Sequence, residues 1–117
     1  MRLSIVTVTL NNLAGLKRTQ ESIIGQTWHD FEWIVVDGGS QDGSVDFLKS
    51  LEIKPAWWVS ELDSGVYNAM NKGVLHANGQ YVIFMNAGDV FHSERTLEQI
   101  FNCDLSARLC DFGSAMR

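Results

Sequence analysis

Polar side chains follow four apolar runs of this chain, at the point where each run ends. The runs LSIVTV, FEWIVV, WWVSE and YVIFM lead into Thr9 and Asn11, into Asp37, into Asp63, and into Asn86 and Asp89. Carboxylate and amide oxygens accept hydrogen bonds and bind hard cations. The carboxyl ends of parallel strands share one edge of a sheet, so we expect these residues to meet in one acidic crevice.

The turn Asn86-Ala87-Gly88-Asp89 places two oxygen-bearing side chains at the end of an apolar run, with a glycine between them. We predict that Asp89 binds a divalent cation, Mg2+ or Mn2+. One carboxylate combined with substrate phosphates is an ordinary arrangement for such ions. The structural alternative is a turn aspartate that precedes a helix.

Asp37 ends an apolar run and enters the glycine-rich loop DGGSQDGS. A carboxylate there is suited to a nucleobase or a sugar hydroxyl, and the alternative is a loop acid that caps the next helix. Asp42 is interpreted as a turn or capping residue. Thr9 and Asn11 either line the same crevice or cap the first helix, and Asn12 is the predicted N-cap.

Asp63 lies beside Ser64 and Gly65, which allow a ligand to approach the backbone closely. The predicted helix that follows carries Asn71 and Lys72. Lys72 is the cation that we expect to meet a diphosphate in this acidic site. A solvated helix lysine is the alternative.

The elements that must position these residues alternate along the chain. Apolar runs predict strands at 3–8, 31–36, 57–60 and 80–85, with a further strand at 108–112. Helical spacing predicts helices at 13–25, 44–51, 66–77 and 94–101. The helix at 66–77 has a predicted buried stripe of Val66, Ala69, Met70, Gly73, Val74 and Ala77. This order predicts an α/β fold with a mostly parallel sheet and flanking helices.

The composition limits the class of protein. The 117 residues suit one domain, and a hydrophobic content of 45% suits a packed core. The net charge of −5 argues against nucleic acid as a partner. No apolar run approaches the ~20 residues that cross a bilayer, and no signal-peptide pattern is present. We therefore expect a cytoplasmic location, peripheral at the inner face of the membrane.

Three strings together resemble a known family: LSIVTVTLNN, FEWIVVDGGSQDGS and ELDSGVYNAMNKGVLHANGQYVIFMNAGD. In this order and at these spacings they resemble the nucleotide-sugar-binding part of a family 2 glycosyltransferase with the Rossmann-like GT-A fold. Bacterial exopolysaccharide and colanic-acid-type enzymes are the most similar. The resemblance implies that residues 1–117 form the donor-binding portion of the domain, truncated at its C-terminus.

The resemblance also implies a reaction. Such enzymes transfer a sugar from a nucleoside diphosphate to the hydroxyl of a saccharide or lipid-linked saccharide acceptor, with inversion, in cell-surface polysaccharide synthesis. The implied donor-site residues are Thr9, Asn11, Asp37, Asp63, Asn71, Lys72 and Asn86, with Asp89 at the metal. The general base is expected beyond Arg117, so we expect this part to be inactive alone and to associate with itself through the truncated face.

Two alternatives come from other classes. A receiver-type signalling domain needs paired acids directly after the first strand, where this chain has Thr9, Leu10 and Asn11. A non-catalytic interaction domain is the other alternative. A dinucleotide-binding dehydrogenase is disfavoured, because TVTLNNLAG lacks the glycine fingerprint after the first strand.

Overall fold

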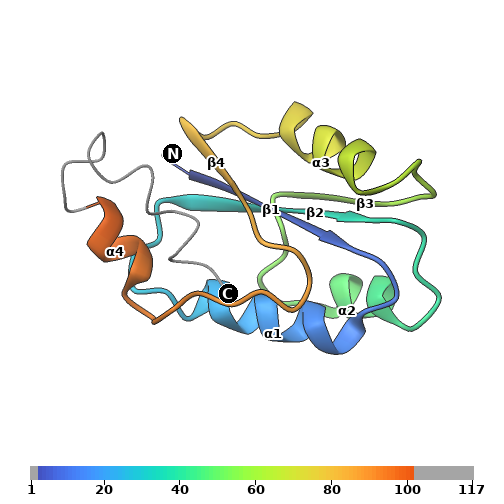
Figure 1. The fold of residues 1–117 in the computed structure, drawn as a ribbon. Helices are drawn as coiled ribbons and strands as arrows, with labels where there is room; N and C mark the ends of the chain where they lie inside the picture. The colour runs from blue at the N-terminus through green and yellow to red at the C-terminus, as the bar shows by residue number, and fades with distance from the viewer. Residues whose placement is uncertain (1–2, 102–117) are drawn as a thin grey trace.

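The computed structural model describes residues 3–101, in which four strands alternate with four helices (Figure 1). The strands are β1 (Leu3–Thr9), β2 (Phe31–Asp37), β3 (Trp57–Ser60) and β4 (Tyr81–Phe84). The helices are α1 (Leu13–Ile24), α2 (Ser44–Ser50), α3 (Val66–Leu75) and α4 (Thr96–Phe101). All eight elements predicted within this range are confirmed, with ends that differ by up to two residues. The predicted strand at 108–112 lies outside the described residues.

The four strands form one parallel sheet in the order β3-β2-β1-β4. The chain builds outward from β1 to β3 and then crosses back to place β4 on the other side of β1. The strand order therefore reverses between β1 and β4. In open α/β sheets, ligands bind outside the carboxyl ends of the strands at such a switch point. The predicted α/β fold with a parallel sheet and flanking helices is confirmed.

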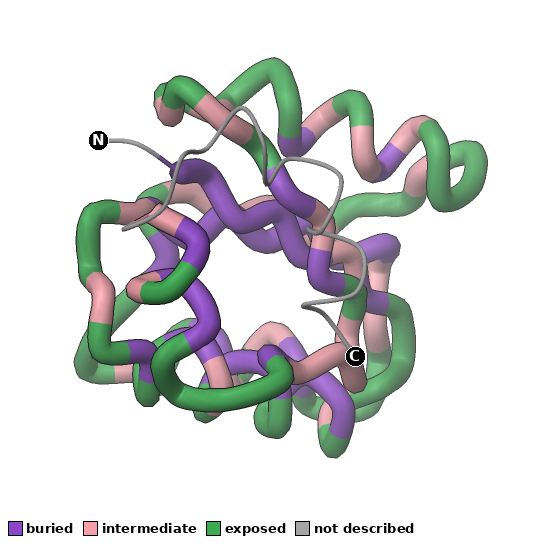
Figure 2. Tube along the Cα trace, turned by 60° about the vertical axis from the view of Figure 1, so that its left-hand side comes forward, coloured by how far each residue is buried: buried purple, intermediate pink, exposed green. Residues whose placement is uncertain are grey.

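Helices α1 and α2 cover one face of the sheet and α3 covers the other (Figure 1). The tube in Figure 2 is buried along most of β1 and β2, which occupy the centre of the sheet. Alternation sends every second side chain of a strand toward α1 and α2. The main core lies in that layer and comprises Leu3, Ile5, Leu16, Ile23, Trp33, Val35, Leu48, Ile83, Met85, Phe91 and Leu97.

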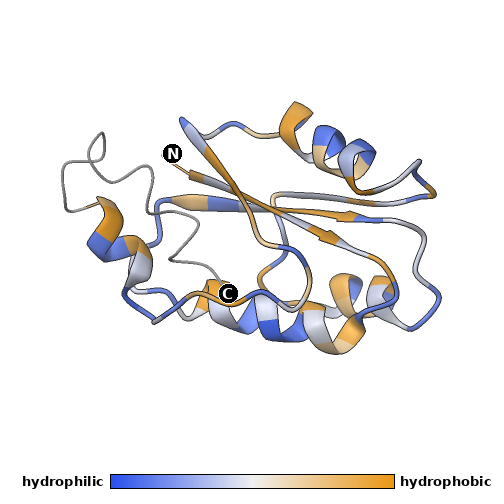
Figure 3. Ribbon diagram, viewed as in Figure 1, coloured by the Kyte–Doolittle hydropathy of each residue, from blue (hydrophilic) through white to orange (hydrophobic). Residues whose placement is uncertain are grey.

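Helix α3 is only partly covered, and this corrects its predicted buried stripe. Ala69 and Gly73 are buried, but Val66 and Val74 are 54% and 44% exposed. The helix packs mainly on β1 and β2. Figure 3 shows hydrophobic residues on α3 as well as along the strands.

Contacts on the opposite flank fix which way α3 is turned. Lys72 pairs with Glu61, which follows β3, and His76 stacks on Trp57 of β3 with ring centroids 3.5 Å apart. The flank that carries Val66 and Val74 therefore lies on the β4 side. Within residues 3–101 no helix is both long and apolar enough to cross a membrane.

Candidate functional site

The loop after β1 is joined to the loop after β2 by Asn11. The Asn11 backbone N–H donates to Ser40 Oγ at 2.7 Å, and the Gln41 N–H donates to Asn11 Oδ1 at 2.8 Å. Asn11 has a φ of 48°, in the left-handed region that asparagine tolerates better than most residues. Asn11 is exposed, and its two hydrogen bonds hold the loops after β1 and β2 together at the carboxyl edge of the sheet.

Asp37 is fully buried at 0% exposure, and both of its carboxylate oxygens accept hydrogen bonds from neighbouring residues. Oδ2 accepts from the backbone N–H groups of Gly39 (3.1 Å) and Ser40 (2.8 Å) and from Ser60 Oγ (2.7 Å). Oδ1 accepts from Ser40 Oγ at 2.5 Å. In this conformation Asp37 organises the loop, which is close to the structural role that the sequence left open.

Asp63 approaches the same loop from β3. A Cβ placed on Gly38 would lie 3.4 Å from Asp63 Oδ2, so this oxygen faces Gly38 in the loop after β2. Asp63 Oδ1 accepts from the Gly65 N–H at 3.2 Å. As expected from the sequence, the loops that carry Asn11, Asp37 and Asp63 meet at one edge of the sheet.

The Asn86–Asp89 turn closes on itself at the end of β4. The Asp89 N–H donates to Asn86 O at 2.9 Å, and the Asn86 N–H donates to Asp89 Oδ2 at 3.0 Å. Gly88 has a φ of 103°, which favours glycine at this position. Asn86 is exposed and Asp89 is half-buried. The turn is therefore a fixed structure that leaves Asp89 Oδ1 without a hydrogen bond from residues 3–101.

Asn12 connects this turn to the other loops. Its Oδ1 accepts from the Gly15 N–H at 3.1 Å, which confirms the predicted N-cap of α1, and its Nδ2 donates to Ala87 O at 3.2 Å. Its neighbour Asn11 holds the β2 loop. The β1–α1 connection thus joins the loops on both sides of the switch point.

Asp42 has the predicted structural role. Its Oδ2 accepts from the Leu13 N–H at 2.9 Å, and its Oδ1 accepts from Ser44 Oγ at 2.6 Å and the Ser44 N–H at 3.1 Å. The hydrogen bond from the Ser44 hydroxyl is the largest cause of a lowered pKa of Asp42, and the backbone bonds add to it. The carboxylate therefore stays ionised while it holds the starts of α1 and α2.

The remaining predicted residues are Thr9, Asn71 and Lys72, and the Thr9 carbonyl accepts from the Gly38 N–H of the β2 loop at 3.0 Å. Lys72 Nζ pairs with Glu61 Oε1 at 3.0 Å, so a diphosphate has to compete with that acid. Asn71 is exposed on α3, and Thr9 is buried at 3% exposure. Within the described residues Thr9 Oγ1 has no hydrogen-bond partner.

Sequence reasoning missed three residues that build the site: Ser40, Ser60 and Thr19. Ser40 and Ser60 hold Asp37, and Thr19 contacts the Asn86–Asp89 turn. A signal for Thr19 was present, because its spacing from Leu16 and Ile23 places it on the buried face of α1. Nothing local to Ser60 indicates its partner.

The described residues offer a metal ion one carboxylate here. No group of three or more His, Cys, Asp or Glu side chains within residues 3–101 forms a metal-binding cluster. This donor set fits Mg2+ or Mn2+ only when phosphate oxygens of a ligand supply further bonds, an arrangement that is ordinary for Mg2+. Asp89 is the carboxylate that the sequence predicts for this role, and its Oδ1 has no hydrogen bond from residues 3–101.

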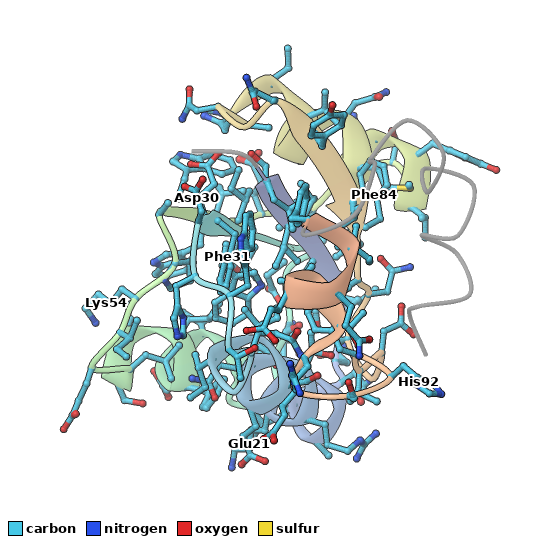
Figure 4. The ribbon with its side chains drawn as sticks, turned by 90° about the vertical axis from the view of Figure 1, so that its left-hand side faces the viewer. Glu21, Asp30, Phe31, Lys54, Phe84 and His92 are labelled. Carbon is cyan, nitrogen blue, oxygen red and sulfur yellow. The ribbon has the colours of Figure 1, made fainter. Side chains whose placement is uncertain are left out.

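A cavity of about 340 Å³ lies at the opposite, amino edge of the sheet. Its lining includes Phe31 and Lys54, which are labelled in Figure 4, a view toward that edge. The other lining residues are mainly apolar, among them Ile23, Trp33 and Ile53. The β2 loop and the Asn86–Asp89 turn supply no lining residue, so this cavity is separate from the candidate site.

Solved structures share the fold. A fragment of S. aureus TarS in complex with UDP-GlcNAc superposes with a TM-score of 0.77 at 21% identity, over 87% of this chain and 30% of that one. The mannosyltransferase PcManGT from Pyrobaculum calidifontis, in complex with GDP-Man and Mn2+, gives a TM-score of 0.72 at 25% identity over 82% of this chain and 30% of that one. The fold is therefore that of GT-A glycosyltransferases.

Sequence relatives point to the same family. An uncharacterised glycosyltransferase of Mycobacterium tuberculosis is 40% identical over 97 residues, which is 82% of this chain and 37% of that protein. The chain thus spans little more than a third of this relative's length. The family model described as "Glycosyl transferase family 2" matches residues 4–102. This match covers most of the sequence, and the chain belongs to glycosyl transferase family 2.

Proposed function

We propose that this chain forms the donor-binding part of an inverting glycosyltransferase that moves a sugar from a nucleoside diphosphate to an acceptor hydroxyl in cell-surface polysaccharide synthesis. The observation that carries this proposal is the pair of fixed loops beside the end of β1. The β2 loop lies on one side and the Asn86–Asp89 turn on the other, and Asn11 and Asn12 hold them. The complex of PcManGT with GDP-Man and Mn2+ supports this assignment.

The two sides suit different parts of a donor. We assign Asn11 and Asp63 to the nucleoside, because Asn11 is hydrogen-bonded to Gln41 of the β2 loop and Asp63 Oδ2 faces Gly38 of the same loop. Thr9 remains a predicted donor-site residue next to them, and Asp37 acts by holding the loop. On the other side, Asn86 is assigned to the diphosphate.

Asp89 would hold Mg2+ or Mn2+ together with the donor phosphates. When bound, the ion supplies Lewis-acid stabilisation of the leaving diphosphate. Asn71 and Lys72 remain predicted diphosphate contacts. Lys72 has to exchange Glu61 for phosphate in that role, so its contribution depends on how readily this partly exposed ion pair opens.

The acceptor side is also a prediction. A saccharide or lipid-linked saccharide supplies the attacking hydroxyl, and its general base is expected beyond Arg117. Residues 1–117 are therefore predicted to bind a donor but to be inactive alone. A cytoplasmic location, peripheral at the inner face of the membrane, remains the prediction from the sequence. The family resemblance further implies a hexosyl donor.

The proposed self-association is assigned to the β4 side of α3, with a second copy as the occupant. Phe84 and Val82 are on the same sheet face as Val6, against which α3 packs, because paired residues of parallel strands share a face. Figure 4 labels Phe84 on the side of α3. Together with Val66 and Val74 they form an apolar surface of the kind that marks an interface.

Calorimetric titration with UDP and GDP, with and without MnCl2, tests the donor site. We expect at least one nucleotide to bind, with higher affinity when Mn2+ is present. Asp89→Ala should abolish the gain from Mn2+ and leave metal-free binding in place, because it removes the carboxylate assigned to the ion. Asp46→Ala, which removes an exposed acid from α2, is the matched control.

Two results would contradict the proposal. One is the absence of binding heat for both nucleotides under both conditions. The other is an Asp89→Ala protein that retains the full gain from Mn2+, which would reject the metal assignment while leaving nucleotide binding intact.

A further inference from the structure

We propose that Thr19 is a positioning residue for the metal site: its buried hydroxyl holds the backbone of the Asn86–Asp89 turn and thereby sets where the Asp89 carboxylate lies. This inference rests on the proposed function, because it takes Asp89 as the metal ligand. It concerns a residue of α1 that touches neither the ion nor the donor in the proposed assignment.

The Thr19 hydroxyl makes its contacts across elements. Thr19 is 0% exposed, and its Oγ1 lies 2.7 Å from Asp89 O and 3.3 Å from Asn86 O. The same oxygen accepts from the Gly88 N–H at 3.0 Å. A helical threonine often bonds a carbonyl of its own preceding turn. Here the hydroxyl instead contacts three residues of the turn after β4.

These contacts act on the backbone that carries the carboxylate. Asp89 Oδ2 is fixed by the Asn86 N–H, and Thr19 contacts the carbonyls of both Asn86 and Asp89. Displacement of either backbone unit moves the carboxylate. The other ties are Gly88 N–H to Gly15 O, Ala87 N–H to Val8 O and Asn12 Nδ2 to Ala87 O. None of these reaches Asp89, so the Thr19 hydroxyl is the link from α1 to the ligand residue within residues 3–101.

Groups that orient a metal ligand affect the affinity for the metal. Loss of such a group commonly costs about 10–100-fold in metal affinity. Among residues 3–101 the proposed site has one protein carboxylate, so no second protein ligand in this range compensates for misplacement of the first. We therefore expect a large effect on the metal-dependent step and little effect on the nucleoside contacts, which lie at the β2 loop.

The test compares Thr19→Val, which keeps the shape but removes the hydroxyl, with Thr19→Ser, which keeps the hydroxyl. UDP binding is measured calorimetrically at several MnCl2 concentrations, and bound Mn2+ is followed by electron paramagnetic resonance. GDP replaces UDP if it is the nucleotide that binds. Thr19→Val should raise the Mn2+ concentration needed for half of the affinity gain by about tenfold or more. Thr19→Ser should restore it, and metal-free affinity should change much less than the metal-dependent gain in either variant.

Asp89→Ala separates the two proposals. If Asp89→Ala loses the Mn2+ gain and Thr19→Val keeps it, the positioning role is overturned and the metal assignment stands. If Asp89→Ala itself keeps the gain, the metal assignment within the proposed function fails, and the positioning role fails with it. Equal weakening of metal-free and metal-dependent binding by Thr19→Val indicates general loss of structure and also overturns the positioning role. If Thr19→Val does not fold, Thr19→Ala is measured in the same way, because it adds no methyl group against the Gly88 N–H.

Discussion

Asp37 is a buried carboxylate that receives four hydrogen bonds from its own loop and from Ser60. Such a carboxylate differs from an exposed one that contacts only a ligand, because its removal leaves several buried hydrogen-bond donors without an acceptor. The structure therefore changes the expected result of a substitution at this position. Stability, rather than affinity alone, should respond.

We expect Asp37→Asn to lower the free energy of unfolding by about 1–3 kcal/mol, because an amide replaces one acceptor oxygen with a donor. Urea denaturation followed by tryptophan fluorescence measures this change, with Asp46→Asn as the exposed control. A variant with unchanged stability and much weaker nucleotide binding would show instead that Asp37 contacts the base directly.

Glu32 is a second buried carboxylate, at the amino edge of the sheet. Burial favours its neutral form, but hydrogen bonds from Ser4 Oγ (2.6 Å) and from the backbone of Asn78 (2.6 Å) favour the ionised form. Contacts with the Asn78 amide and the Gly79 N–H act in the same direction. The net result is a pKa of Glu32 below its ordinary value of 4.5.

This shift makes stability depend on pH. The folded protein binds the Glu32 proton more weakly than the unfolded chain, so the stabilisation is complete above pH 4.5 and is lost as pH falls through the lower folded pKa. Urea denaturation as a function of pH should therefore show a smaller loss below pH 4.5 for Glu32→Gln than for the wild type. Equal acid sensitivity of the two proteins would assign the loss to other carboxylates, such as Asp42.

At the scale of elements, α3 packs on the sheet through a glycine. A Cβ on Gly73 would overlap Val6 Cγ1, so the helix backbone lies directly on β1. Alanine is preferred over glycine in a helix by about 1 kcal/mol, whereas overpacking a core costs about 1–3 kcal/mol. Which effect wins depends on whether Val6 is able to give way, and its full burial in the central strand leaves it no room.

We therefore expect Gly73→Ala to destabilise the protein in thermal denaturation. In a Val6→Ala background the same change should become neutral or stabilising, because the obstructing methyl group is gone while the helix preference remains. Leu75→Ala, on the exposed side of the same helix, is the control. Equal effects of Gly73→Ala in the two backgrounds would contradict close packing of α3 on β1.

At the scale of the whole molecule, the uncovered β4 side of α3 is the largest departure from the sequence expectation for this helix. Val74→Lys places a charge on this apolar surface, and Leu75→Lys places the same charge on the same helix away from it. If copies associate through this surface, sedimentation velocity should show dimers for the wild type and Leu75→Lys and monomers for Val74→Lys. Monomers for all three proteins at high concentration would contradict the proposed self-association.

Local sequence determined the architecture. Periodicity and capping residues specify the alternating strands and helices, since they depend on neighbours within one or two turns. Asn12 and Asp42 were identified for the same reason, because Asn12 accepts from Gly15 and Asp42 accepts from Ser44, each at the start of the helix that follows. The parallel order then brings the strand ends, with their polar residues, to one edge.

Only the tertiary structure decided which of these polar groups are available. Asp37 is closed off by Ser60 from another strand, Lys72 is paired with Glu61, and Thr19 reaches a turn 70 residues away. None of these partners follows from a local pattern, because hydrogen bonds between distant segments depend on how the strands and helices pack. The sequence alone therefore predicted where the site lies, and the packed fold separated the residues that build it from those that remain open to a ligand.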